Sequence, residues 1–278
     1  MFTQQRALLS ASFSLPDSRF GVCYSETISM EKLLILWALV RRDYALQYAG
    51  SFLGISWMFL QNLVLISLYA VVFLVLNLKT PSTQDDFTAY LLTGLLFWIP
   101  LQEFLVRGTG ILTDNRTLLK RSSLGLDLFI WIPFVQYLIH MLVTSLPVFL
   151  LLAYYDKLNY WGLVSGLLCL VGVGLYLLLF LHYLSRLNVL LKDISPLVRL
   201  VSQVLFWGIP VLYYPKGFLR EINLLNPLTI PLDIFRSLVI KGFVPQFDWM
   251  GIFPFLFTFI LVYLLAKKKF QTVILDHL

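Results

Sequence analysis

Long runs of apolar residues, separated by short polar and charged segments, dominate the sequence. These runs fall at about 50–78, 87–107, 127–153, 160–184, 197–214 and 249–267. A helix needs about 20 residues to cross the hydrocarbon core of a bilayer, so most of these runs are long enough. The pattern predicts an all-α integral membrane protein with six transmembrane helices.

Composition supports lipid as the main solvent. Hydrophobic residues make up 59% of the 278 positions and charged residues 13%, whereas a soluble domain has about a quarter charged residues. The mean hydropathy is +0.82. Residues 1–29 lack the basic-then-apolar layout of a secretory signal, so we expect an N-terminal cytoplasmic extension there and a membrane domain at 30–278.

The distribution of basic residues predicts the topology. Most of the 21 Lys and Arg residues precede the first predicted span, follow the second and fourth, or follow the sixth. Loops rich in Lys and Arg stay on the cytoplasmic side. Both termini and the loop between the second and third spans are therefore expected in the cytoplasm.

The segment from Met30 to Tyr48 is apolar in its middle and then basic. Such a segment is typical of an amphipathic helix that lies along the inner membrane interface, with Trp37 at headgroup depth. Arg41 and Arg42 would then reach lipid phosphates or a partner. The alternative is an amphipathic start to the first span.

Two loops carry further patterns. The loop at 114–124 predicts a short helix in which Leu118 and Leu119 lie beside basic residues. That helix could dock into a groove of a soluble partner, or the loop could be solvated and basic.

Residues 209–246 are apolar, aromatic and rich in proline, which predicts short re-entrant helices between the fifth and sixth spans. An outer-surface loop with aromatic side chains is the alternative. Asp233 and Arg236 are spaced to pair on one helical face.

Catalytic motifs are missing from the sequence. It contains no G-x-x-x-x-G-K-[ST] nucleotide loop, no nucleophile elbow and no metal-ligand spacing. His140 and His182 fall within predicted spans, but the charge-free runs around them, Leu128–Tyr155 and Leu158–Ser185, contain no Asp or Glu. We therefore favour neutral, hydrogen-bonded histidines over catalytic ones, and we predict no catalytic residue and no metal. If the protein pumps a substrate, its energy must come from another protein or source, because the sequence has no nucleotide-binding loop.

The order of motifs resembles the ABC type-2 permeases that export polysaccharides, including O-antigen, capsule and teichoic acid. The series spans most of the chain, and its order is more specific than any one motif. It comprises Arg42-Asp43 with Tyr48, Ser51, Leu53-Gly54 and Trp57; Gly94 to Trp98; Asn115 with Leu118 to Lys120; Lys192-Asp193-Ile194; Pro210 to Tyr213; Asn226-Pro227; and Phe235-Arg236.

The resemblance implies a homodimeric channel in the bacterial inner membrane, with two separate ATPase subunits docked beneath it. ATP and Mg would bind those subunits, so the chain itself is expected to be a transport subunit without a cofactor. The cargo implied is an undecaprenyl-pyrophosphate-linked polysaccharide, with membrane lipid as a further partner and no nucleic acid.

The resemblance also assigns residues to roles. The segment that couples to the ATPase would comprise Asp114, Asn115, Leu118, Leu119, Lys120 and Arg121. The interfacial helix would present Trp37, Arg41, Arg42 and Asp43, with a pyrophosphate head met by Arg41 or Arg42. The re-entrant region would contain Pro210, Asn226, Pro227, Asp233 and Arg236.

Aromatic side chains offer sugars flat apolar faces and, in Tyr and Trp, a polar tip. Candidates for the channel lining are Tyr69, Tyr90, Trp98, Tyr137, Tyr213 and Tyr214, although core or interfacial packing remains the alternative for each. Two other functions stay open on the sequence. One is an ABC type-2 exporter of drugs or lipids, and the other is a membrane-embedded lipid-modifying enzyme that would use His140 or His182.

Overall fold

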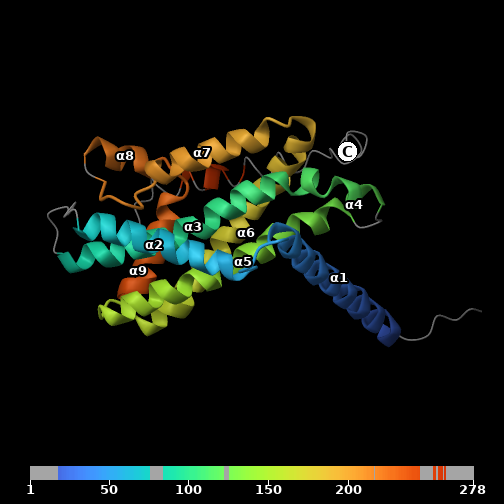
Figure 1. Ribbon diagram of the computed structural model, residues 1–278, viewed down its shortest axis with the longest axis horizontal. Helices are drawn as coiled ribbons and strands as arrows, with labels where there is room; N and C mark the ends of the chain where they lie inside the picture. The colour runs from blue at the N-terminus through green and yellow to red at the C-terminus, as the bar shows by residue number, and fades with distance from the viewer. Residues whose placement is uncertain are drawn as a thin grey trace, which may run out of the picture.

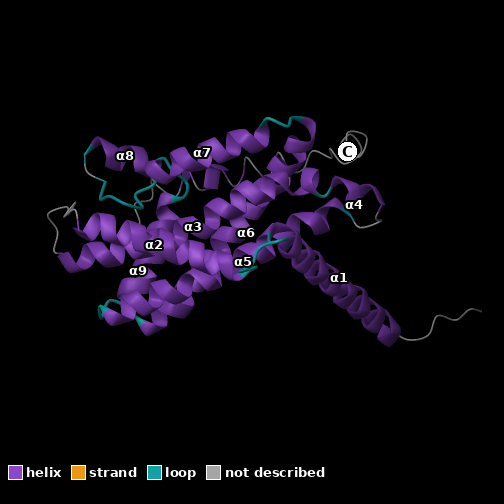
Figure 2. Cartoon of the chain, viewed as in Figure 1, coloured by secondary structure: helices purple, strands orange, loops and turns teal. Residues whose placement is uncertain are grey.

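The computed structural model describes residues 18–75, 84–121, 125–215 and 217–244, together with 253–254, 256–258 and 260. Within these residues the chain forms helices and no strand, so the all-α prediction is confirmed (Figures 1 and 2). The helices are α1 (Ser18–Gln47), α2 (Ser56–Val75), α3 (Gln84–Asp114), α4 (Arg116–Arg121), α5 (Leu126–Tyr154), α6 (Tyr160–Leu190), α7 (Ile194–Gly208), α8 (Phe218–Leu224) and α9 (Thr229–Lys241).

Three of these helices form the centre of the bundle. In the described part of the chain, the segments Phe87–Asp114, Leu126–Tyr154 and Tyr160–Leu190 are long and apolar enough to cross a membrane. α3 packs against both α5 and α6 and supplies large buried side chains, among them Phe97, Trp98 and Phe104. α2 and α7 are apolar but shorter, and they cover further faces of α3.

Local chemistry explains where the helices differ from the predicted spans. The first span was expected to begin near residue 50, but Gly50 and Gly54 adopt positive φ values and α2 begins only at Ser56. The fifth was expected to run from 197 to 214, but α7 ends at Gly208, just before Pro210, whose ring disfavours a continuing helix. Most of the sixth, at 249–267, lies outside the described residues.

The connection between α5 and α6 is a short hairpin. Asp156 adopts a φ of 54°, and the side chain of Asn159 caps α6 by accepting from the backbone N–H groups of Trp161 and Gly162. α9 then packs very closely on α6. A Cβ on Gly162 would lie only 1.9 Å from the carbonyl oxygen of Leu238, so this contact requires glycine.

α1 differs from the other long helices because most of it projects away from the bundle (Figure 1). Its last turns pack on the core, where Leu39, Val40 and Tyr44 are buried. The helix begins at Ser18, so it extends back into the segment expected to be a separate N-terminal extension. α4 and α8 lie at opposite ends of the bundle (Figure 1).

Candidate functional site

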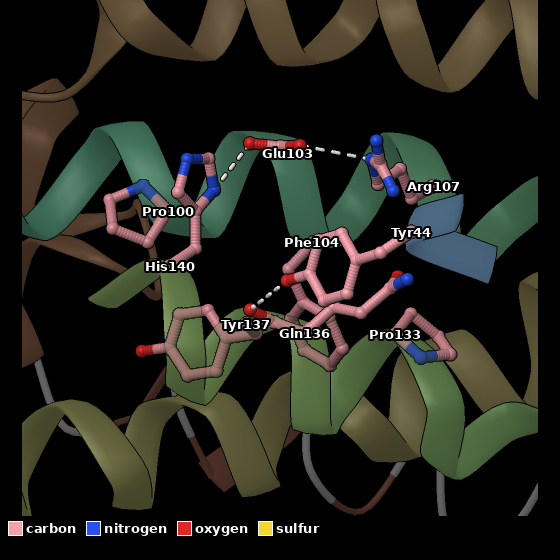
Figure 3. A pocket seen from close by; sticks show the side chains of 9 residues that line it. All are labelled: Tyr44, Pro100, Glu103, Phe104, Arg107, Pro133, Gln136, Tyr137 and His140. Atoms are coloured by element: carbon pink, nitrogen blue, oxygen red, sulfur yellow. Dashed lines mark hydrogen bonds and ion pairs between the residues drawn. The ribbon is translucent and has the colours of Figure 1, made fainter. Parts of the chain in front are cut away.

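A small pocket with both polar and apolar lining lies where the end of α1 meets α3 and α5 (Figure 3). Its volume is about 10 Å³, close to the space that one water molecule needs. Its lining residues are Tyr44, Pro100, Glu103, Phe104, Arg107, Pro133, Gln136, Tyr137 and His140. We call Asp43, Glu103, Arg107, Gln136 and His140 the carboxylate cluster.

Glu103 is the centre of this cluster. Its carboxylate accepts a hydrogen bond from Nε of Arg107 at 2.9 Å, one turn further along α3, and pairs on its other side with Nδ1 of His140 on α5 (Figure 3). His140 therefore has an acidic partner, which the sequence analysis had not found. The apolar run around His140 contains no acidic residue, and the carboxylate comes from the neighbouring helix α3.

His182 on α6 repeats this arrangement near the ends of α5 and α6. Its Nε2 lies 3.3 Å from Oδ1 of Asp127, and the same oxygen accepts from Nη2 of Arg186 at 2.7 Å. The carboxylate again comes from a neighbouring helix, so both histidines of the predicted spans have an acidic partner. The neutral state that we favoured for them stays a prediction.

Asp43 joins α1 to the cluster. Its Oδ2 accepts a hydrogen bond from Nε2 of Gln136 at 2.6 Å and lies 3.8 Å from Nη1 of Arg107. The hydroxyl of Tyr44 makes a long contact of 3.5 Å to the backbone oxygen of Gln136. Burial raises the pKa of the Tyr44 phenol, so this hydroxyl stays a neutral donor. Successive residues of α1 thus contact two helices of the bundle.

The predicted coupling segment forms α4, with Asp114 as the last residue of α3 and Asn115 at the corner between them. Leu119 is buried and Leu118 is half-buried against the core, whereas Lys120 and Arg121 are exposed. The two leucines therefore do not form an exposed docking face in the single chain. The sequence could not reveal which side of so short a helix would turn inward.

The predicted interfacial residues separate into two groups. Trp37 and Arg41 are exposed on α1, as expected of residues that meet lipid or a partner. Arg42 instead turns toward the bundle, where its Nη2 donates to the side-chain oxygen of Asn115. Asp43 belongs to the carboxylate cluster.

A second polar site lies in the predicted re-entrant region. Arg236 on α9 is only 5% exposed, and its Nη2 donates to the carbonyl oxygens of Val211 at 3.1 Å and Tyr90 at 3.3 Å. Its guanidinium carbon lies 3.5 Å from the centre of the Tyr90 ring, a cation–π contact. Asp233 pairs with Nη1 at 3.8 Å. We call Tyr90, Gly94, Val211, Asp233 and Arg236 the guanidinium clamp.

The clamp satisfies the backbone of the irregular segment 209–215 that follows α7. The hydroxyl of Tyr90 lies 2.8 Å from the carbonyl oxygen of Pro210 and 2.9 Å from that of Tyr213. Together with Arg236 it covers three carbonyls of the segment, at residues 210, 211 and 213. Non-helical backbone at membrane depth persists only where such partners exist.

The other candidate channel aromatics mostly pack within the chain. Trp98 and Tyr137 are buried, and the Tyr137 hydroxyl donates to the carbonyl of Leu170 at 2.8 Å. Tyr69 packs on Phe206 of α7. The ring of Tyr214 lies 4.0 Å from that of Tyr90, and the hydroxyl of Tyr213 accepts from Asn223.

The remaining residues of the re-entrant region lie near turns. The side-chain oxygen of Asn226 accepts from the backbone N–H of Leu228 at 3.0 Å, which closes the turn between α8 and α9. Pro227 is half-buried in that turn, and Pro210 is buried just beyond the end of α7. The structure thus brings Pro210, Tyr90 and Arg236 together, while Asn226 and Pro227 shape the neighbouring turn.

These features define a class: an all-helical membrane protein in which several polar side chains pair with one another inside an apolar bundle. No family model matches the chain. It is similar to the O-antigen export system permease protein RfbA of Myxococcus xanthus, with 28% identity over 76% of this chain and 82% of that protein. It is also similar to the O-antigen export system permease protein RfbA of Klebsiella pneumoniae, with 24% identity over 80% of this chain and 85% of that protein. The resemblance to ABC type-2 permeases of the O-antigen export family is confirmed.

Proposed function

We propose that this chain is the permease subunit of an ATP-driven exporter that moves a lipid-linked polysaccharide, such as O-antigen, across the bacterial inner membrane. The observation that carries this proposal is the similarity, over about three quarters of the chain, to two permeases of O-antigen export systems. The three apolar helices of membrane-spanning length support it.

The energy for export is proposed to come from a partner. The sequence has no nucleotide-binding loop, so ATP and Mg would bind two separate ATPase subunits beneath a homodimer of this chain. α4 is the proposed coupling helix. Because Leu119 faces the core while Thr117, Lys120 and Arg121 are exposed, its contact with the ATPase would be made by a basic and polar face. A matching acidic groove on the ATPase would steer and orient the two subunits.

The proposed topology has six spans, with α4 and both termini in the cytoplasm and the re-entrant helices α8 and α9 on the outer side. Labelling with a membrane-impermeant maleimide in intact cells tests it, after Cys23 and Cys169 are replaced by serine. Phe218→Cys should react from outside, and Thr117→Cys should react only after the membrane is opened. Labelling of Thr117→Cys in intact cells would reverse the orientation and remove α4 from the ATPase side.

Reconstitution tests the function itself. The chain would be co-expressed with a candidate ABC-type ATPase subunit from the same organism, purified as a complex and placed in proteoliposomes. A lipid-linked O-antigen glycan should stimulate ATP hydrolysis and be moved across the bilayer, and hydrophobic drugs should do neither. Stimulation by drugs alone would identify a drug exporter of the same architecture. Failure of the ATPase to co-purify would overturn the proposal.

Charge reversal tests the basic face of α4. Lys120→Glu with Arg121→Glu should weaken co-purification of the ATPase, because both side chains are exposed and would repel an acidic groove. Lys241→Glu, an exposed lysine at the end of α9, is the matched control and should leave the complex intact. Equal co-purification of all three proteins would show that α4 does not bind through its charge.

A further inference from the structure

The Arg42-Asp43 pair is part of the motif series, yet the proposed function gives it no role. The structure gives each side chain its own partner. Arg42 donates to Asn115, beside α4, and Asp43 accepts from Gln136 in the middle of the bundle. Two neighbouring residues of α1 thus contact two separate parts of the membrane domain.

Asn115 is the corner at which α3 ends and α4 begins. Its backbone carbonyl accepts hydrogen bonds from the N–H groups of Leu118 and Leu119, at 3.1 and 3.0 Å, which start α4. Its side-chain nitrogen donates to the carbonyl of Ile111 on α3 at 3.0 Å. The residue is only 4% exposed. A displacement of α4 must therefore act on Asn115, and Asn115 is the residue that Arg42 binds.

Asp43 continues this path into the bundle. Its contacts with Gln136 on α5 and Arg107 on α3 lead on to Glu103, which binds both Arg107 and His140. Buried Leu39, Val40 and Tyr44 hold the same turns of α1 against the bundle. The end of α1 therefore cannot move without changing contacts on α3 and α5.

We propose that Arg42 and Asp43 are positioning residues that transmit the movement of α4 to α5. The Arg42–Asn115 hydrogen bond carries a displacement of the α3–α4 corner to α1, and the Asp43–Gln136 hydrogen bond passes it to the bundle. Both bonds involve a charged partner, which makes them stronger and more directional than neutral ones. The inference rests on the proposed function, since it requires an ATPase that moves α4.

The test uses the complete complex with its ATPase in proteoliposomes and measures glycan exported per ATP hydrolysed. Arg42→Ala and Asn115→Ala should each lower this ratio about tenfold, the effect of one charge-assisted hydrogen bond, while ATP hydrolysis continues. The double variant should be no worse than either single one, because both remove the same bond. Lys32→Ala, which removes an exposed cation on the same helix, is the matched control and should keep the normal ratio.

Conservative variants separate positioning from a loss of folding. Asn115→Asp keeps an acceptor for Arg42 and should retain most of the ratio even if Asn115→Ala does not fold. Gln136→Met breaks the second bond without touching α4, and it should lower the ratio while the ATPase still co-purifies. Normal ratios in Arg42→Ala and Gln136→Met, or additive losses in the double variant, would overturn this inference alone. A wild-type chain that binds no ATPase would overturn the proposed function and this inference with it.

Discussion

The carboxylate cluster and the guanidinium clamp place charges among apolar helices in two different ways. In the cluster, Asp43 and Glu103 supply acceptors, and Arg107, Gln136 and His140 supply donors, so most groups have more than one partner. In the clamp, Arg236 is the only charged donor among the named members, and its hydrogen-bond acceptors are backbone carbonyls.

This difference in the number of partners indicates where the bundle tolerates substitutions. A buried polar group left without a partner costs more than the net gain of making the bond. Loss of Glu103 leaves Arg107 with Asp43 at 3.8 Å, and Glu103 is also a third exposed. Loss of Arg236 leaves the carbonyl of Val211 without its donor in a non-helical segment. We therefore expect substitutions in the clamp to cost more than substitutions in the cluster.

The largest effect is expected at Gly94, on which the guanidinium of Arg236 lies. A Cβ there would stand 2.6 Å from Nη2 of Arg236 and 2.7 Å from the carbonyl oxygen of Val211. Gly94→Ala should therefore lower the free energy of unfolding by about 3 kcal/mol, the upper range for overpacking. SDS titration in mixed micelles measures this. Gly172→Ala, whose Cβ meets no atom within 4 Å, is the control, and equal stability of the two variants would contradict the clamp geometry.

Removal of the buried cation should have the next largest effect. Arg236→Met fills similar space but loses the hydrogen bonds to Val211 and Tyr90. Because the variant no longer buries a charge, part of this loss is offset, and the free energy of unfolding should fall by about 2 kcal/mol. The same titration measures it, with Lys241→Met at the exposed end of α9 as control. A stable Arg236→Met protein would mean that the segment 209–215 holds its shape without the cation.

The sequence was most informative where an apolar run is bounded by charges on both sides. The third span was predicted at 127–153, and α5 covers Leu126–Tyr154. The second was expected to end near residue 107, yet α3 continues to Asp114. Glu103 and Arg107 satisfy each other one turn apart, so the helix continues beyond Arg107, where the predicted span ended.

The sites were less predictable because their contacts are not local. Asp233 and Arg236 were expected to pair from their spacing on one helix, and they do so at 3.8 Å. The Arg42–Asn115 and Tyr90–Arg236 contacts join residues 73 and 146 positions apart. Such contacts depend on how the helices pack, which hydrophobic periodicity does not specify. The signal for the partner of His140 was Glu103, an acidic residue within a neighbouring apolar span.

A smaller effect is expected when only a hydroxyl of the clamp is lost. Tyr90→Phe keeps the ring beneath Arg236 but removes the hydroxyl shared by the carbonyls of Pro210 and Tyr213, at a cost of about 1 kcal/mol. The matched control is Tyr160→Phe at the start of α6, where the side chain is 80% exposed. If both variants were as stable as wild type, the cation alone would hold the segment.

The smallest effect is expected in the cluster, at Glu103→Gln. The amide keeps the shape of the carboxylate and can still accept from Arg107 or His140, and Arg107 retains Asp43 within 3.8 Å, so the cost should be about 0.5 kcal/mol. Adding Asp43→Asn removes the second carboxylate near Arg107. The double variant should therefore lose more stability than the two single losses together, because each carboxylate compensates for the other in the single variants. A single Glu103→Gln variant as unstable as Arg236→Met would show that the cluster is no more redundant than the clamp.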